Sequence, residues 1–309
     1  MLHLNDHQVE NLLEGSEVQI VQYMEDVFKD FVTGRAKMIP KTYLTTRWKG
    51  DFRAMPASWQ DISGIKWISV FPNNHKSNLP TIHGTLLLND TLTGEPIISM
   101  DCAKLTGYRT AAVSALAAKH LTVSNIVHTL TFIGCGYQSK LHMMMYAAVF
   151  PNIKRVKLYD INTESVDKLM HWMDKKYKLE SVSTYDNIPH ACSNADVITT
   201  LTPSTEAYLG LDDIDDTVMH INAIGADAPG KRELKDDIWQ KFDLVVDDEE
   251  QATHSGETQY VDGVPHYTLK ELIQGGDVKD KPTVFDSTGL AIEDIAIGKL
   301  IYEKYNQGN

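Results

Sequence analysis

The sequence predicts an α/β protein in which an α+β domain precedes a doubly wound parallel sheet domain. Two changes of pattern along the chain indicate this. Before Thr129, short strand-like runs are separated by turn residues, whereas after it apolar strands alternate with helical patterns. After Gly289, apolar residues recur at a period near that of a helix. The chain has 309 residues, which is enough for two cores of ordinary size.

The first part of the chain predicts one helix and a mostly antiparallel sheet. Ser16 can cap a helix whose apolar residues keep helical spacing up to Gly34, a residue typical of helix ends. Strands are expected at residues 52–55, 65–71, 85–88 and 97–100. An Ala-rich stretch without a breaker, residues 110–121, predicts the helix that leads out of this domain.

The second part of the chain predicts the doubly wound sheet. Strands are expected at residues 130–133, 155–159, 197–201, 220–224 and 244–246. Helices at residues 137–149 and 164–177 separate the first three strands, and such alternation is typical of a parallel sheet. We place one domain at residues 1–119 with 288–309 and the other at residues 120–287, so that the C-terminal helix returns to the first domain.

Composition excludes several classes of function. The 29 Lys and Arg residues face 42 Asp and Glu residues, and the net charge of -13 argues against a nucleic-acid or an anionic membrane surface. The three cysteines are far apart, which suggests neither a disulfide framework nor a zinc site, and we expect no metal. No run approaches about 18 apolar residues, so neither a signal peptide nor a membrane span is expected. A cytoplasmic protein fits these observations.

The segment HTLTFIGCGYQSK, residues 128–140, ends a strand with Gly-x-Gly and opens a helix. Gly134 permits the tight turn, and Gly136 lets the backbone approach a diphosphate. The helix that begins at Tyr137 offers N–H groups to the anion. Ser139 stands where the dinucleotide fingerprint has its third glycine, but alanine is accepted there and serine adds one oxygen. The loop is therefore expected to close as in a Rossmann domain.

Asp160 ends the next strand, about 20 residues or slightly more after the loop, where a carboxylate can take the ribose hydroxyls of a dinucleotide. Its charge would repel the 2′-phosphate of NADP, so the sequence favours NAD as the cofactor. The alternative is an ordinary strand turn followed by a surface aspartate.

Lys66 lies on an apolar strand face. In GIKWISVF, strand alternation puts Lys66 on the same face as Ile68 and Val70. Either its stem reaches along the sheet to water, or it lines a pocket where burial lowers its pKa toward use in acid–base chemistry. The spacing alone leaves both readings open.

Two further charged residues are candidates for a ligand site. Arg109 stands at the start of the predicted Ala-rich helix, where the helix dipole disfavours a cation, so we expect it to meet a ligand anion or to pair with Asp101 or another surface carboxylate. Asp227 follows the strand in HINAIGAD, at the edge where open α/β sheets bind ligands. It can handle a proton there, or it can cap a helix that follows.

Nine segments together resemble the ornithine cyclodeaminase and mu-crystallin family, and within it the archaeal-type alanine dehydrogenases. They occur in the family's order over nearly the whole chain: PKTYL, GDFRAMPAS, GIKWISVFPNN, LPTIHGTLLLND, YRTAAVSALAAKHL, FIGCGYQS, INAIGADAPGKREL, VVDDEEQATHSGE and FDSTGLAIEDIA. The resemblance implies a homodimer with a substrate-binding and dimerisation domain, followed by an NAD(P)-binding Rossmann domain.

The resemblance also implies roles for individual residues. Lys66 and Asp227 match the catalytic pair, and Arg109 matches the residue that binds the substrate carboxylate. Lys41 and Arg53 fall at substrate positions, and cyclodeaminases carry glutamate where Arg53 stands. Beside Gly134, Gly136 and Tyr137, the cofactor positions are Thr81, Thr110, Gln138, Asp160, Gly225, Lys231 and Ser287.

The expected activity is that of an NAD-dependent amino-acid dehydrogenase, which interconverts a small L-amino acid with its keto acid and ammonia. Arg53 favours this over a cyclodeaminase, because it would repel the distal ammonium of ornithine. The alternatives are ornithine cyclodeaminase, a reductase of ketimines or N-substituted amino acids, and a non-catalytic binder of the mu-crystallin kind. The expected partners are the small-molecule substrate and a second copy of the chain.

Overall fold

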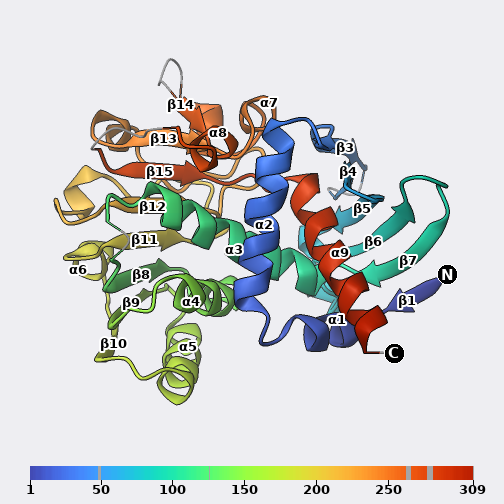
Figure 1. Cartoon of the computed structure of the whole chain (residues 1–309). Coiled ribbons are helices and arrows are strands. Elements are labelled where there is room, and N and C mark those ends of the chain that lie inside the picture. Colours follow the sequence, from blue (N-terminus) through green and yellow to red (C-terminus); the bar gives the residue numbers. More distant parts are fainter. Residues whose placement is uncertain (48–49, 125, 262–265, 277–280, 309) are drawn as a thin grey trace. The chain divides into compact units, whose positions relative to one another are not determined.

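The computed structural model describes residues 1–47, 50–124, 126–261, 266–276 and 281–308 (Figure 1). The chain forms two compact units. Unit 1 comprises Met1–Ala112 with Gly289–Asn309, and unit 2 comprises Val113–Thr288. The border falls within one continuous helix, α3 (Ala103–Leu121). The predicted α/β fold is confirmed, and the C-terminal helix folds with the N-terminal part of the chain.

Unit 1 contains a seven-stranded sheet in the order β1-β7-β6-β5-β4-β2, with β3 also paired to β4. Its strands are β1 (Leu2–Leu4), β2 (Ala36–Met38), β3 (Thr42–Thr45), β4 (Asp51–Trp59), β5 (Ile62–Val70), β6 (Ile82–Asp90) and β7 (Pro96–Asp101). Neighbouring strands are antiparallel except β1 and β7, which confirms the predicted mostly antiparallel sheet. The sequence does not predict β1, β2 or β3, because three or four residues are too few to show a period of two.

The helices of unit 1 are α1 (Asp6–Leu13), α2 (Glu17–Val32), α9 (Ala291–Gln307), the first part of α3, and the short 3₁₀ helix η1 (Pro72–Ser77). α2 is the first predicted helix, and Gly34 beyond its end has a φ of +74°, a left-handed value that favours glycine. Ser16 precedes α2, but its side chain makes no capping hydrogen bond. α9 packs along α2 and against β4 and β5 (Figure 1).

Unit 2 contains an eight-stranded sheet in the order β10-β9-β8-β11-β12-β15-β13-β14, and every neighbouring pair is parallel. Its strands are β8 (Thr129–Ile133), β9 (Arg155–Tyr159), β10 (Ser181–Thr184), β11 (Val197–Thr200), β12 (His220–Ala223), β13 (Asp243–Val246), β14 (His266–Thr268) and β15 (Thr283–Asp286). The chain runs outward from β8 in one direction and then restarts at β11 in the other. This doubly wound order creates a switch point beside β8, where such sheets bind ligands.

The predicted helices of unit 2 are confirmed as α4 (Tyr137–Val149) and α5 (Thr163–Lys176). The remaining helical segments, apart from the end of α3, are α6 (Ile188–Cys192), α7 (Glu249–Ala252), α8 (Leu269–Ile273), η2 (Leu211–Asp213), η3 (Asp236–Gln240) and η4 (Glu257–Tyr260). Asn162 caps α5, because its side chain accepts from the N–H groups of Glu164 and Ser165. No helix in the described part of the chain has the length and hydropathy that a membrane crossing requires.

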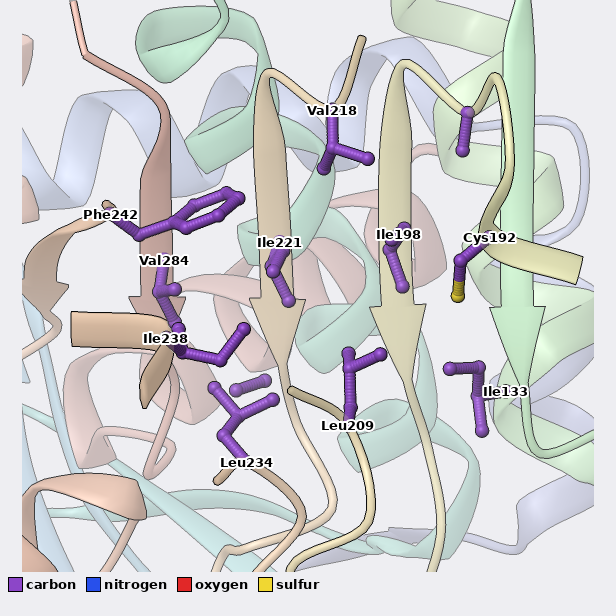
Figure 2. Packing of buried hydrophobic residues seen from close by; sticks show 12 residues of the cluster. Ile133, Cys192, Ile198, Leu209, Val218, Ile221, Leu234, Ile238, Phe242 and Val284 are labelled. Atoms are coloured by element: carbon purple, nitrogen blue, oxygen red, sulfur yellow. The ribbon is translucent and has the colours of Figure 1, made fainter. Parts of the chain in front are cut away.

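A hydrophobic cluster fills one face of the unit 2 sheet (Figure 2). Ile198, Ile221 and Val284 are partners in register on three adjacent strands, and all three are fully buried. Leu209 and Leu234 join two loops through an isolated β-bridge and lie in the same cluster. Each such side chain stabilises the fold by about 1.5–3 kcal/mol when removed from water. The cluster therefore anchors the loops that follow β11 and β12.

Candidate functional site

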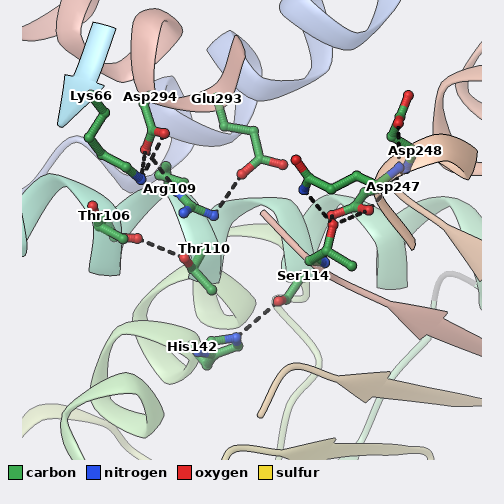
Figure 3. A network of polar contacts seen from close by, with 12 residues as sticks. Lys66, Thr106, Arg109, Thr110, Ser114, His142, Asp247, Asp248, Glu293 and Asp294 are labelled. Carbon is green, nitrogen blue, oxygen red and sulfur yellow. Dashed lines mark hydrogen bonds and ion pairs between the residues drawn. The ribbon is translucent and has the colours of Figure 1, made fainter. Parts of the chain in front are cut away.

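Lys66 is enclosed in unit 1. It projects from the inner face of β5, only 1 % of its surface is exposed, and Met55 and Leu86 are its neighbours in register. Its Nζ lies 2.8 Å from Oδ1 of Asp294, at the start of α9 (Figure 3). Burial lowers the pKa of Lys66, and the charge of Asp294 opposes that change. The reading in which Lys66 reaches water along the sheet is therefore wrong.

Arg109 does not stand at a helix start, and that prediction is wrong. α3 begins at Ala103, so Arg109 lies beyond the first turn, where the dipole argument has no force. Its Nη1 donates to Oε2 of Glu293 at 2.8 Å, and its Nε donates to Oδ1 of Asp294 at 3.1 Å (Figure 3). Both partners are fully buried carboxylates of α9 rather than surface ones.

Lys66, Arg109, Glu293 and Asp294 form one group, the charged cluster. It contains two cations and two carboxylates, so the buried charge is balanced. Gly289 precedes α9 with a φ of +79°, and a Cβ there would lie 2.6 Å from Nη1 of Arg109. Only glycine therefore lets the chain pass so close to the guanidinium.

The sequence reasoning missed Glu293 and Asp294. The signal was present, because two acids stand together in the otherwise apolar GLAIEDIAIG. The same argument that singled out Lys66, a charge among apolar neighbours, applies to them.

Arg53 shares the inner face of the sheet with Lys66. It is opposite Ile68 in register, as Met55 is opposite Lys66, and it is buried. Its Nε lies 2.7 Å from Oδ1 of Asp51, and its guanidinium lies over the ring of Tyr43. These contacts fix Arg53 on β4, which pairs with β5, the strand that carries Lys66.

The other candidates of unit 1 lie in flanking segments. Lys41 is half-buried just before β3, and Thr81 is exposed just before β6. Thr110 follows Arg109 on α3, and its hydroxyl donates to the backbone oxygen of Thr106 at 2.7 Å.

In unit 2, the glycine loop has the form expected of a diphosphate site. Gly134 has a φ of +100°, and a Cβ there would lie 2.8 Å from the backbone oxygen of Leu201. Gly136 is the N-cap residue of α4, no side chain caps this helix, and the space where a Cβ would stand is open. Ser139 is buried and donates to the backbone oxygen of Gly134 at 2.5 Å, so its extra oxygen closes the loop. The residues present fit a dinucleotide's diphosphate.

Asp160 is not an ordinary surface aspartate. Its Oδ2 accepts from the N–H of Cys135, inside the glycine loop, at 2.7 Å, and its Oδ1 accepts from that of Asn162 at 2.8 Å. It lines a pocket of about 620 Å³ at the ends of β9 and β10. The other lining residues are Tyr159, Ile161, Thr163, Val166, Asp167, Thr184, Tyr185 and Asp186. Three carboxylates in this pocket suit hydroxyl groups and disfavour a phosphate.

The remaining candidates of unit 2 lie at the start of α4 and beyond β12 and β15. Tyr137 is exposed, and the side-chain oxygen of Gln138 is buried without a hydrogen-bond partner in the described structure. Oδ1 of Asp227 lies 2.6 Å from Nζ of Lys231. No helix follows in residues 227–235, so the reading of Asp227 as an N-cap is wrong. Ser287 is buried and donates its N–H to Ala223.

Glu233 organises the loops that precede Asp227, and the sequence reasoning missed it. Its carboxylate accepts five hydrogen bonds at 2.6–2.8 Å. The donors are the hydroxyls of Thr200, Thr202 and Tyr208 and the N–H groups of Thr202 and Gly225. A Cβ at Gly225 would lie 2.1 Å from the backbone oxygen of Thr202, so the two loops touch here.

Three more buried carboxylates accompany Glu233, and the four form the acid cluster: Glu233, Asp247, Glu257 and Asp286. Burial, followed by the charge of Asp286, raises the pKa of Glu257 to about 8, and burial raises the pKa of Asp286 to about 7. Oδ1 of Asp286 has no hydrogen-bond partner in the described structure. The raised pKa values of Glu257 and Asp286 favour protons on these two carboxyl groups near neutral pH.

Comparisons with known proteins identify the family of the chain. The family model described as the ornithine cyclodeaminase/mu-crystallin family matches residues 2–309. The chain is 37% identical over 313 residues to alanine dehydrogenase from Archaeoglobus fulgidus, covering 98% of this chain and 94% of that protein. It is 30% identical over 311 residues to ornithine cyclodeaminase from Agrobacterium fabrum, covering 98% of this chain and 85% of that protein.

Two solved structures resemble the whole chain. An archaeal alanine dehydrogenase dimer with bound NAD has a TM-score of 0.91 and 36% identity, covering 100% of this chain and 97% of that one. The Δ1-pyrroline-2-carboxylate reductase of Thermococcus litoralis, in complex with NADH and L-proline, has a TM-score of 0.91 and 29% identity, covering 100% and 98%.

Proposed function

Because the chain belongs to the ornithine cyclodeaminase/mu-crystallin family, we propose that it is an NAD-dependent dehydrogenase of L-alanine or another small L-amino acid. The amino acid, NAD and water give the keto acid, ammonia, NADH and a proton, reversibly. The observation that carries this proposal is the enclosed Lys66, paired with Asp294 and linked through it to Arg109. Similarity to alanine dehydrogenase supports it.

Unit 2 supplies the NAD-binding domain of this proposal. The helix start behind Gly136 holds the diphosphate, and Asp160 accepts the adenosine ribose hydroxyls. NAD bound there would supply the hydride acceptor for oxidation of the amino acid at Cα to an iminium. Further contacts to the cofactor are assigned to Thr81, Thr110, Gly134, Tyr137, Gln138, Gly225, Lys231 and Ser287.

Unit 1 supplies the substrate-binding domain. Arg109, together with Lys41 or Arg53, binds the substrate carboxylate, since guanidinium groups match a carboxylate with two parallel donors. The substrate amine must be neutral before hydride leaves Cα. Water then adds to the iminium carbon and loses both of its protons in turn: one reaches the nitrogen, which departs as ammonia, and the other is released. Lys66 and Asp227 share these transfers, and burial lowers the pKa of Lys66 from its ordinary value, which favours its use as a proton donor and acceptor.

Arg53 separates this activity from that of a cyclodeaminase. Its guanidinium is buried on the face that carries Lys66, and a distal ammonium there would meet a like charge. The similarity to ornithine cyclodeaminase keeps that activity as the second candidate.

A homodimer is part of the proposal. The outer face of the unit 1 sheet carries Leu44 and Trp67, both exposed, and Phe52 stacks on Trp67 at 5.3 Å between ring centroids. An apolar sheet face of this kind suits a second copy of the chain. We expect light scattering to give a dimer mass, and Trp67→Glu to give a monomer mass, whereas a monomeric wild type contradicts this.

The test is incubation of the protein with NAD and single amino acids, including L-alanine and L-ornithine. NADH, ammonia and proline are measured in each reaction. We expect NADH and ammonia in equal amounts with a small amino acid and no proline from ornithine. Proline without accumulated NADH establishes the cyclodeaminase. NADH oxidation with a cyclic imine but not with keto acid and ammonia establishes a ketimine reductase, and tight NADH binding without any turnover establishes a binder.

A further inference from the structure

The two adjacent acids of α9 contact the two cations of the charged cluster differently. Asp294 bridges both cations, because Oδ1 and Oδ2 each lie 2.8 Å from Nζ of Lys66 and Oδ1 also accepts from Nε of Arg109. Glu293 holds Nη1 of Arg109 at 2.8 Å. Both acids are fully buried and stand in the first turn of a 17-residue helix (Figure 3).

Lys66 faces few charged or titratable groups in unit 1. Its register partners Met55 and Leu86 are apolar. It also faces Arg109 of α3 and Cys102, which immediately precedes α3. Burial raises the pKa of that thiol to about 11, so the thiol is neutral at neutral pH. Asp294 is thus the carboxylate that offsets both the burial of Lys66 and the repulsion by Arg109.

Resting on the proposed function, we propose that Asp294 and Glu293 are positioning residues with separate tasks. Asp294 holds Lys66 in its charged and oriented state, and Glu293 orients the guanidinium of Arg109 toward the substrate carboxylate. Removal of the first acid changes the proton transfers, whereas removal of the second changes substrate binding.

The separation of tasks follows from the contacts. Without the charge of Asp294, Lys66 keeps its burial and its repulsion by Arg109, so its pKa falls further. Without the charge of Glu293, Arg109 keeps its charged hydrogen bond to Asp294 through Nε, whereas the contact at Nη1 is reduced to a weaker, neutral hydrogen bond. A guanidinium whose contact to one carboxylate is weakened has more freedom, and this freedom weakens its two-point binding of a substrate carboxylate.

The experiment compares Asp294→Asn and Glu293→Gln with the control Glu10→Gln, which breaks the partly exposed pair with Lys104 in the same unit. The rate constant kcat and the KM for the amino acid are measured from about pH 6 to about pH 11, around the ordinary pKa of lysine. Asp294→Asn is expected to move the ionisation in kcat to lower pH by about one unit or more. Glu293→Gln is expected to raise KM about tenfold with an unmoved profile, and the control leaves both unchanged.

Two further measurements keep the outcomes separate. Asp294→Glu restores the charge, so its profile is expected to return toward that of the wild type. Carbon-13 NMR of lysine-labelled protein follows the Cε resonance of Lys66, assigned by its loss in Lys66→Met, across the same pH range, and reports the protonation of this buried amine without any turnover. An activity loss in Asp294→Asn with no shift in either profile overturns the proposal. If the wild type turns over no amino acid, the proposed function fails, and the NMR titration midpoint of Lys66 in Asp294→Asn still supports or overturns the role of Asp294.

Discussion

The charged cluster of unit 1 and the acid cluster of unit 2 each bury four ionisable side chains, and each unit uses a different way to tolerate the burial. In unit 1, two cations face two carboxylates. In unit 2, four carboxylates are stabilised by N–H and hydroxyl donors, and burial raises the pKa values of two of them, Glu257 and Asp286, so that these two retain protons to higher pH. The comparison shows that buried charge can serve two purposes: the balanced cluster is suited to handle a substrate's charges and protons, whereas the acid cluster fixes loops.

The largest effect is expected where the balance of unit 1 is broken. Arg109→Met leaves one cation, Lys66, with the two buried carboxylates of the charged cluster. We expect a loss of about 3–5 kcal/mol in the free energy of unfolding, which is typical of removing one partner from a buried ion pair. Urea unfolding measures it. The double variant Arg109→Met with Glu293→Gln restores equal numbers of buried cations and carboxylates and is expected to recover part of the lost free energy. Equal losses in the single and the double variant contradict the claim that charge balance stabilises unit 1.

The acid cluster is expected to make stability depend on pH. Glu257 and Asp286 have pKa values raised from their ordinary 4.5 and 3.8 to about 8 and about 7, so the folded state retains protons that the unfolded state releases. Their contribution is complete below about pH 4 and is lost as pH rises through about 7 to 8, by several kcal/mol for the two groups together. Urea unfolding at several pH values measures this slope. Asp286→Asn should flatten it, and an unchanged slope contradicts the assignment.

A smaller effect is expected at Glu233. In Glu233→Gln the amide must face five donors with one oxygen and two N–H groups, so several donors lose their acceptor. We expect a loss of about 1–3 kcal/mol in the free energy of unfolding. The exposed Glu206 provides the control variant Glu206→Gln. If both variants unfold at the same urea concentration, Glu233 does not organise these loops.

The smallest effect is expected in the glycine loop. Ser139→Ala removes the hydroxyl that donates to Gly134 and keeps the small side chain. The free energy of unfolding should fall by about 0.5–1.5 kcal/mol, the net value of one hydrogen bond. NADH affinity, measured by fluorescence, should change less than about threefold, because the N–H groups that bind the anion remain. A much larger loss of affinity indicates that Ser139 contacts the cofactor itself.

The fold could be predicted because strand and helix periods are local signals. Alternation within β5 places Lys66 on one face with Ile68 and Val70, but it does not show whether that face is buried. α3 begins at Ala103 and not at residue 110, although Gly107 is unfavourable inside a helix by about 1 kcal/mol. Tertiary packing therefore outweighs this local preference. Arg109 consequently lies inside α3, where the helix dipole does not explain its partners.

The partners in the charged cluster could not be predicted from local patterns. Lys66 and Asp294 are 228 residues apart, and no spacing rule connects them. The role of Glu233 could not be predicted either, because no spacing rule connects it to its donors. These belong to Thr200, Thr202, Tyr208 and Gly225. A sequence identifies a charge in an apolar segment, but only the folded chain identifies what neutralises it.

The central claim is that the charged cluster carries out proton chemistry while unit 2 binds NAD. The most direct test is the turnover of Lys66→Met with NAD and L-alanine at saturation, in protein whose NADH affinity matches that of the wild type. We expect turnover to fall at least about a thousandfold, because a group that moves protons is lost. Turnover close to that of the wild type contradicts the claim.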